Sequence, residues 1–239
     1  SLREMPIHPR LGKMLLLGSK MGIPNLTSEL AALLSEPSGK GSSRMSDWEN
    51  DILSRWYEWR RSRGSPRFRN LDRAAKQLQE MLSGSGTDIC SPESAFEQFL
   101  PELFLEVFPD RICKRRRAGE PQAKISGGRG VRLHPDSSVR SSEYFIAIEL
   151  TEGRDLSETL VFQAVGIPSE VFEKVFGEQA EFVKKMEWDE EKKRFYVLEC
   201  REWRSLSMGG EHKRPASLEE IEGRLAELAA ARFTWISND

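Results

Sequence analysis

Eight basic side chains between residues 111 and 132 give this 239-residue sequence its densest positive charge, and Glu120 is the one acid among them. They are Arg111, Lys114, Arg115, Arg116, Arg117, Lys124, Arg129 and Arg132. Each cation that meets a nucleic-acid phosphate releases a counterion, so this stretch would give binding a strong salt dependence. A solvated basic loop that binds nothing is the alternative, and the residues themselves leave both interpretations open.

A second basic excess lies earlier, where residues 44–76 hold nine basic and five acidic side chains. Arg67 and Arg69 flank Phe68 there, and cations beside an aromatic ring are typical of surfaces that bind single-stranded nucleic acid. Phe68 also fits the apolar stripe of an amphipathic helix, and we favour that interpretation of its ring.

No segment has the residues of a catalytic centre. Residues 39–42 (GKGS) lack the upstream glycine of a phosphate-binding loop and have glycine where magnesium needs Ser or Thr, so they predict a flexible loop. There is no Asp-Glu-Ala-His tetrad, and residues 127–130 (GGRG) indicate a tight turn. His8, His134 and His212 have no second metal ligand at ligand spacing. An independent enzyme is therefore the least favoured hypothesis.

The chain as a whole carries 36 basic and 38 acidic side chains, a net charge of −2. The balance is +6 for residues 1–132 and −8 for residues 133–239, which indicates an interaction surface on the first half. Cys90, Cys113 and Cys200 are too widely spaced for a disulfide framework or a metal site, which favours a reducing compartment. We find no membrane-spanning run and no signal-peptide pattern, so we expect a cytoplasmic chain.

Three regions have to position this chemistry. Apolar residues at helical spacing predict helices within residues 1–108, one of them beginning with a capping box of Ser46 and Glu49. Alternating residues then predict strands over 123–126, 131–134, 144–150, 159–164, 182–188 and 194–203, with a helix at 168–176 and a last helix from Ser217 to about residue 232. We therefore predict an α+β fold with three domains: a helical bundle (1–108), a small β domain (109–205) and a C-terminal extension with one helix (206–239).

Several motifs resemble DEAH-box helicases. Residues 5–15 (MPIHPRLGKML) look like the start of the family's helical-bundle, or ratchet, domain, and residues 31–35 (AALLS) resemble its next helix. Residues 133–138 (LHPDSS) and 143–147 (EYFIA) resemble the His-Pro-x-Ser loop and next strand of the family's OB-fold. Three further segments look like the bacterial HrpB branch: residues 108–112, 128–133 and 187–189.

The resemblance implies that residues 109–205 form an OB-like barrel and that the chain is an accessory C-terminal region of an ATP-dependent RNA helicase. The family's ATPase motifs lie in two RecA-like domains that would precede residue 1, so ATP and magnesium are expected there and no cofactor is expected in this fragment. In the family these accessory domains help to hold single-stranded RNA. His134, Ser137 and Ser138 match the motif and join the basic residues as candidate RNA contacts.

Two functional hypotheses follow. In the first, the chain is a monomer that guides single-stranded RNA or another nucleic acid and contacts the helicase core of the same protein. In the second, the acidic residues 133–239 form a protein-interaction or regulatory module that docks on the core or on another partner.

Overall fold

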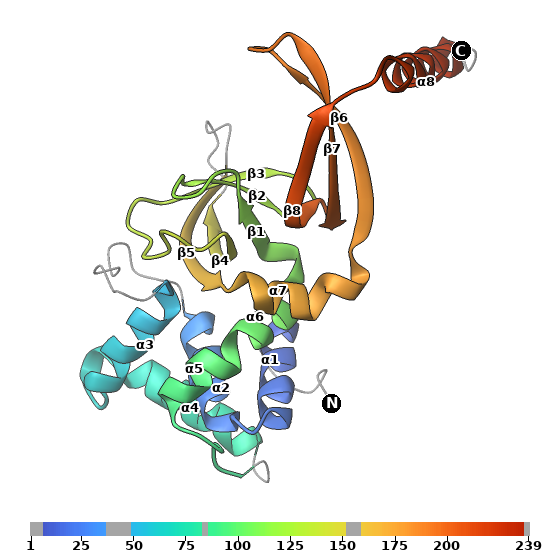
Figure 1. Cartoon of the computed structure of the whole chain (residues 1–239). Helices are drawn as coiled ribbons and strands as arrows, with labels where there is room; N and C mark the ends of the chain where they lie inside the picture. Colours follow the sequence, from blue (N-terminus) through green and yellow to red (C-terminus); the bar gives the residue numbers. More distant parts are fainter. Residues whose placement is uncertain (1–6, 37–48, 83–85, 152–158, 237–239) are drawn as a thin grey trace. The chain divides into compact units, whose positions relative to one another are not determined.

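The computed structural model describes residues 7–36, 49–82, 86–151 and 159–236 (Figure 1). It divides into two units, Ser1–Phe176 and Gly177–Asp239. The first unit holds a helical region and a closed β-barrel, and the second holds a three-stranded sheet and a long helix. The predicted α+β fold is confirmed.

The helical region consists, within the described residues, of α1 (Pro9–Lys20), α2 (Pro24–Ser35), α3 (Asp51–Arg61), α4 (Arg69–Met81), α5 (Pro92–Gln98) and α6 (Leu100–Val107). Pro9, Pro24 and Pro92 each stand in a first helical turn, where proline's missing N–H costs no hydrogen bond. The helices α1 and α2 pack closely at Gly18, which has no side chain; an added Cβ atom there would collide with the side chain of Thr27.

A buried carboxylate ties α2 to α3. Glu29 is 3% exposed and accepts hydrogen bonds from Trp56 Nε1 at 2.8 Å and Arg60 Nη1 at 3.0 Å, and Arg63 also donates to it. Burying a charge is costly unless such partners replace its water. The aromatic stripe of α3 is thereby held against α2, with Trp56 and Trp59 both buried.

The start of α3 differs from the prediction. Ser46 lies outside the described residues, and the helix is capped by Asn50, whose side chain accepts a hydrogen bond from the backbone N–H of Leu53 at 3.0 Å. Glu49 accepts instead from the backbone N–H groups of Arg140 and Ser142, 2.9 and 2.7 Å away. The Glu49 side chain, which the sequence predicts to cap the following helix, therefore makes a long-range contact to the barrel instead.

The barrel is formed by β1 (Ile112–Arg115), β2 (Gln122–Ile125), β3 (Gly130–Leu133), β4 (Tyr144–Thr151) and β5 (Thr159–Ile167). The strands close in the order β1-β2-β3-β5-β4, with β3 parallel to β5 and the other neighbours antiparallel. The inward side chains, which include Cys113, Val131 and Phe145, form one apolar core. This closed five-stranded barrel agrees with the expected OB-like fold.

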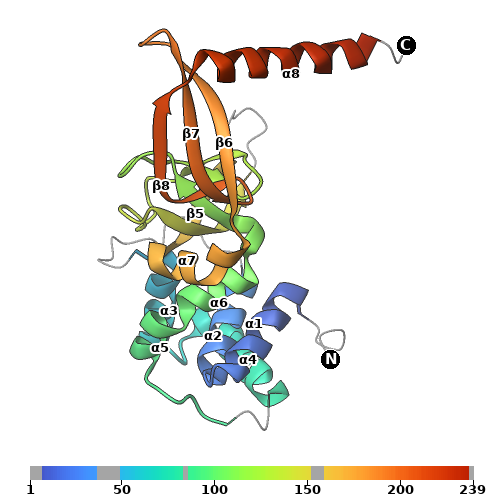
Figure 2. The same ribbon diagram turned by 45° about the vertical axis from the view of Figure 1, so that its right-hand side comes forward.

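The helix α7 (Ser169–Phe176) lies between α6 and the barrel (Figure 2). Its Phe172 ring packs on Tyr144 of β4 with the centroids 4.3 Å apart, and both side chains are buried. Helix and barrel thus share one apolar interface within the first unit.

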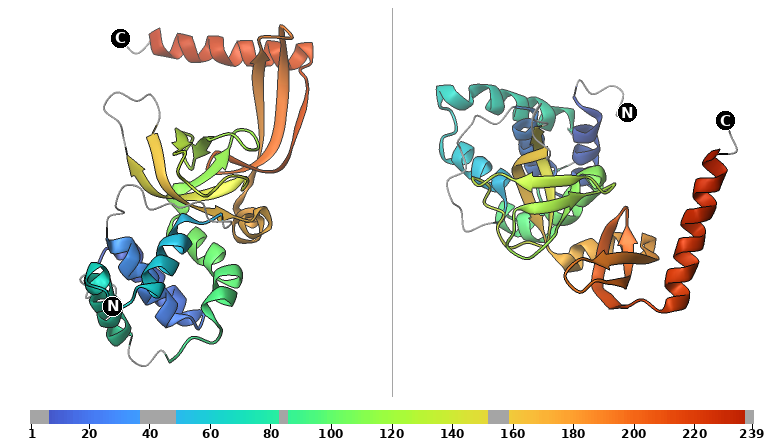
Figure 3. Two further views of the ribbon diagram at one scale, coloured as in Figure 1. Left: turned by 90° about the vertical axis from the view of Figure 1, so that its left-hand side faces the viewer. Right: turned by 90° about the horizontal axis from the view of Figure 1, so that it is seen from above.

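The second unit contains β6 (Glu181–Asp189), β7 (Arg194–Trp203), β8 (Leu206–Pro215) and α8 (Leu218–Ile236). The three strands form a sheet of their own, in the order β6-β7-β8. The barrel strands end at Ile167, and residue 205, where we expected the β domain to end, lies in the β7–β8 turn of this second sheet. Past its first turn, α8 extends away from the sheet of its unit (Figure 3).

Candidate nucleic-acid interface

The strands β1, β2 and β3 separate their residues onto two faces. Since successive side chains of a strand point to opposite sides, the burial of Cys113, Ala123 and Val131 in the core places their neighbours outside. Those neighbours are Lys114, Lys124 and Arg132, and Lys114 and Lys124 are direct partners across the β1–β2 ladder. A row of cations thus crosses three adjacent strands.

Three loop cations add to this face. A Cβ atom at Gly130 would lie 3.3 Å from Arg116 Nη2, so the Arg116 guanidinium reaches across to β3. Arg117 is exposed in the β1–β2 connection, with Glu120 at 3.6 Å, and Arg129 is exposed just before β3.

The electrostatics of the face favour an anionic ligand. Like charges on facing strand positions repel, and Lys114 is balanced by Glu143 at 3.3 Å. The side chains of Arg116, Lys124 and Arg132 make no hydrogen bond or ion pair with any other described residue. A phosphate chain that paired with these three cations would release counterions and so gain affinity.

An aromatic surface continues the face onto β5. The rings of His134 and Phe162 stack with centroids 4.7 Å apart and an interplanar angle of 28°. The parallel pairing of β3 with β5 sets Arg132 opposite Leu160, so Phe162 lies two residues further along the same outer face. Phe162 is absent from the sequence-based set because that pairing is long-range. We name the outer face formed by Lys114, Arg116, Lys124, Arg132, His134 and Phe162 the outer barrel face.

The Arg115 side chain is buried and has a structural role. Its residue is 5% exposed, and its guanidinium donates to the carbonyl oxygens of Ser142 and Val139, both at 2.8 Å, and also to that of Glu120. Burial lowers the pKa of Arg115 from its ordinary value. The guanidinium holds three backbone segments together and does not lie on the outer barrel face.

Ser137 and Ser138 are likewise buried, at 1% and 7% exposure. Asp51 at the start of α3 accepts from Ser137 Oγ at 2.7 Å, from Ser138 N at 2.7 Å and from Ser138 Oγ at 2.8 Å. The same carboxylate accepts from the N–H of Ala164 at 2.8 Å. The serines of the motif therefore anchor the barrel to the helical region, and their side chains are not exposed for nucleic acid.

Arg67 lies in the connection between α3 and α4, and Arg69 is the first residue of α4, so both belong to the helical region and not to the barrel strands. Arg67 pairs with Glu58 at 2.6 Å and its guanidinium lies 4.9 Å from the centre of the Phe68 ring. Phe68 is half-buried, and Arg69 is exposed. The structure does not bring these two arginines to the outer barrel face.

Two searches of the described residues bear on other classes of site. No group of three or more His, Cys, Asp or Glu side chains there is arranged to hold a metal ion. No helix in the described part of the chain combines the length and the apolar character needed to cross a membrane.

The fold and the site together define a class: a helical region joined to a closed five-stranded barrel with a basic, partly aromatic outer face. No protein-family model matches the sequence, and no curated protein matches it. Two solved structures share the fold, the Escherichia coli DExH-box NTPase HrpB with a TM-score of 0.59 and the Escherichia coli DEAH/RHA helicase HrpB with a TM-score of 0.56.

Both matches cover 90% of this chain at 20% identity. They cover 24% of the HrpB chains, so this chain spans about a quarter of the length of those proteins. The resemblance to HrpB that the motifs indicate is thus confirmed in the fold.

Proposed function

We propose that this chain is the non-catalytic, C-terminal accessory region of an HrpB-like, ATP-dependent RNA helicase, and that it guides single-stranded RNA along the outer barrel face. The likeness to a quarter of HrpB supports the parent class. ATP and magnesium would bind to the remaining helicase domains of the parent protein. The parent would be a cytoplasmic monomer in which this chain contacts those domains.

One observation carries the proposal: cations and stacked rings lie on one continuous outer face across β1, β2, β3 and β5. Cations that track a phosphate backbone, together with rings on which bases stack, are the two features of single-strand binding. In OB-folds the face of strands 2 and 3 and the adjoining loops bind oligonucleotides. Lys124 and Arg132 belong to those two strands, and Arg116 and Arg117 to the loop between strands 1 and 2.

The test measures binding of a fluorescent single-stranded RNA to the 239-residue chain over a range of salt concentrations. A triple variant, Arg116→Gln/Lys124→Gln/Arg132→Gln, removes three charges that have no described partner. At about 0.7 units of log–log salt slope per phosphate contact on a single strand, we expect the slope to fall by about 2.

A matched control removes the same number of positive charges from a different surface. Lys20→Gln/Arg61→Gln/Arg73→Gln removes three exposed cations from the helical region. This control is expected to retain the wild-type slope. Equal slopes for the two triple variants, or no RNA binding by the wild type at low salt, would refute the outer barrel face as the binding surface.

Stacking is tested separately from charge. Phe162 is half-buried, so Phe162→Leu preserves most of its packing on the barrel while removing the ring that stacks with His134. Loss of one base–aromatic stack costs about 1–3 kcal/mol, so we expect RNA affinity to fall about 5- to 150-fold with an unchanged salt slope. Unchanged affinity would remove Phe162 from the interface.

A second candidate function rests on α8. Its Leu218 is 77% exposed and Leu225 is 58% exposed, and Glu219, Glu222 and Glu227 lie on the same helix. Such a helix suits a partner that is apolar and basic, whether the helicase core or another protein. Retention of a protein partner that is insensitive to RNA and is lost with Leu218→Ser/Leu225→Ser would favour this function.

A further inference from the structure

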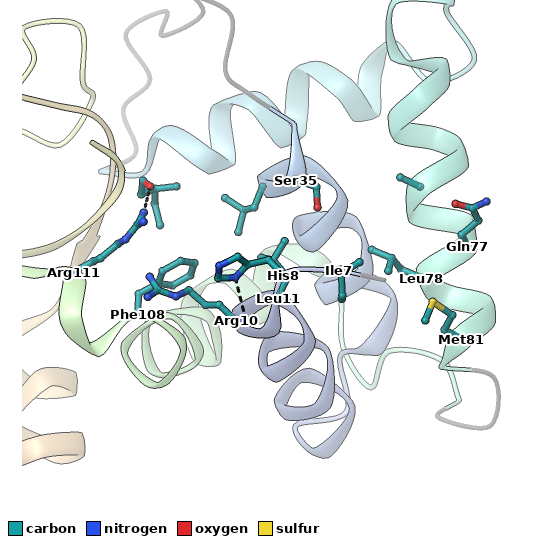
Figure 4. A pocket seen from close by; sticks show the side chains of 13 residues that line it. Ile7, His8, Arg10, Leu11, Ser35, Gln77, Leu78, Met81, Phe108 and Arg111 are labelled. Carbon is teal, nitrogen blue, oxygen red and sulfur yellow. Dashed lines mark hydrogen bonds between the residues drawn. The ribbon is translucent and has the colours of Figure 1, made fainter. Parts of the chain in front are cut away.

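A cavity of about 600 Å³ lies in the first unit between the start of α1, the helix α4 and the segment that enters the barrel (Figure 4). Leu11, Leu34, Leu78 and Met81 form an apolar wall, and Ile148 of β4 closes one end. This volume is within the range of about 300–1,000 Å³ that small-ligand sites occupy. The cavity does not include the outer barrel face.

Two arginines stand at the barrel end of the cavity. Arg10 donates through Nη2 to Asp110 at 2.9 Å, and Arg111 donates through Nη1 to the carbonyl oxygen of Ile148 at 2.6 Å. Both arginines line the same end of the cavity in Figure 4. Burial, and then the charge of Arg10, lowers the pKa of Arg111. Two cations near one carboxylate favour the entry of a further anion.

Arg10 also has a donor that lacks a partner. Its Nη1 is shielded from solvent and makes no hydrogen bond with the described residues. An unmade hydrogen bond on a buried, charged donor is costly. A phosphate oxygen between Arg10 and Arg111 would give this nitrogen an acceptor, and guanidinium groups bind phosphate oxygens through two parallel N–H donors.

The rest of the cavity suits a flat heterocycle. The Arg10 guanidinium lies 5.1 Å from the centre of the Phe108 ring, and Figure 4 shows the His8 ring beside them. Across the cavity, Gln77 of α4 carries an amide that both donates and accepts, next to the apolar Met81. A ligand with a phosphate at one end and a hydrogen-bonding aromatic base at the other matches both halves.

We propose that this cavity is a nucleotide site, with the phosphate between Arg10 and Arg111 and the base against Leu78 and Met81. The nucleotide is either a free monophosphate or the 5′-phosphorylated end of an RNA strand, since both present the same chemistry. The site is independent of the function proposed for the outer barrel face.

The experiment is an NMR titration of the 239-residue chain with AMP, following the methyl groups of Leu78 and Met81. Arg10→Gln is expected to weaken AMP binding at least tenfold, because it removes the cation nearest the phosphate. Ala74→Phe places a ring in the cavity without touching either arginine and is expected to abolish binding. Lys20→Gln, at the exposed end of the same helix α1, is the charge-matched control and should bind within twofold of wild type.

Titrations with a 5′-phosphorylated RNA trinucleotide and with inorganic phosphate complete the test. Shifts with AMP support a free nucleotide, and shifts with a 5′-phosphorylated RNA trinucleotide alone support a strand end. Inorganic phosphate that binds as tightly as AMP would overturn the site for the base. No saturable shift with either nucleotide, or equal affinity of wild type and a folded Ala74→Phe variant, would overturn the proposal. The outer-face triple variant should bind AMP normally, so the two proposals fail separately.

Discussion

Replacement of Asp51 by alanine tests how the barrel is anchored to the helical region. The Asp51 residue is 3% exposed, and its carboxylate accepts four hydrogen bonds, two from serine hydroxyls and two from the backbone N–H groups of Ser138 and Ala164. The donors lie 86 to 113 residues away in sequence, so this one side chain connects segments that are far apart along the chain.

The magnitude follows from the donors left behind. The hydroxyl groups of Ser137 and Ser138 can rotate towards other acceptors, but the two N–H groups cannot. Each buried donor without a partner costs about 1–3 kcal/mol, so Asp51→Ala is expected to lower the free energy of unfolding of the first unit by about 2–6 kcal/mol. That is a large part of the 5–15 kcal/mol or so that stabilises a typical domain.

The assay is urea unfolding followed by circular dichroism, with amide hydrogen exchange at Ser138 and Ala164. Asp136→Ala is the matched control, because Asp136 lies in the same loop with its side chain 64% exposed and should change stability by less than about 0.5 kcal/mol. An Asp51→Ala protein within about 0.5 kcal/mol of wild type, with unchanged protection of the two amides, would refute the reasoning.

Three more predictions concern the same unit. Burial opposes ionisation of Glu49, but hydrogen bonds from Ser142 and from the Arg140–Ser142 backbone outweigh it and lower its pKa from 4.5 to about 2. The Glu49 carboxylate therefore contributes to the free energy of unfolding above pH 4.5, and this contribution is lost as the pH falls towards 2. After a discount for partial exposure the contribution is about 1–2 kcal/mol. The urea midpoints of wild type and Glu49→Gln should differ at pH 7 and converge near pH 2. Arg115→Met should lower the melting temperature by several degrees while leaving the salt slope of RNA binding unchanged, whereas a changed slope would return Arg115 to the interface. Gly18→Ala should cost about 1–3 kcal/mol in urea unfolding through its collision with Thr27, and a neutral result would contradict the close packing of α1 on α2.

Periodicity in the sequence predicts most of the elements, including the short strands β2 and β3 to within one residue, but it misses β1 and β8. The strands β4, β5 and β7 and the helix α7 lie where alternation and helical spacing predict them. The strand β8 was missed because its turn, Arg204 and Ser205, adopts positive φ angles of 46° and 67° without the Asn-Gly or Asp-Gly residues that normally mark such a turn.

The four-residue strand β1 was also missed, and this omission explains why the sequence placed Arg115 among the candidate RNA contacts although its side chain is buried. Once Ile112–Arg115 is a strand, the alternation that sends Cys113 into the core sends Arg115 in the same direction and Lys114 outward. A run of consecutive cations gives no sign of this separation unless the strand and its register are known. The roles of Ser137 and Ser138 were hidden for a different reason, because their partner Asp51 is distant in sequence.

Because the basic residues 111–132 divide into buried and outward-facing side chains, the salt dependence predicted for RNA binding changes. Eight cations contacting phosphates of a single strand would give a log–log salt slope of about 5–6. Arg115 is buried and Arg111 donates to the Ile148 carbonyl, which leaves Lys114, Arg116, Lys124 and Arg132 on the outer barrel face, with Arg117 and Arg129 in its loops. Four to six contacts correspond to a slope of about 3–4. A measured slope near 6 would mean that two further cations contact the same RNA. If these are Arg67 and Arg69, Arg67→Gln/Arg69→Gln would lower the slope by about 1.4.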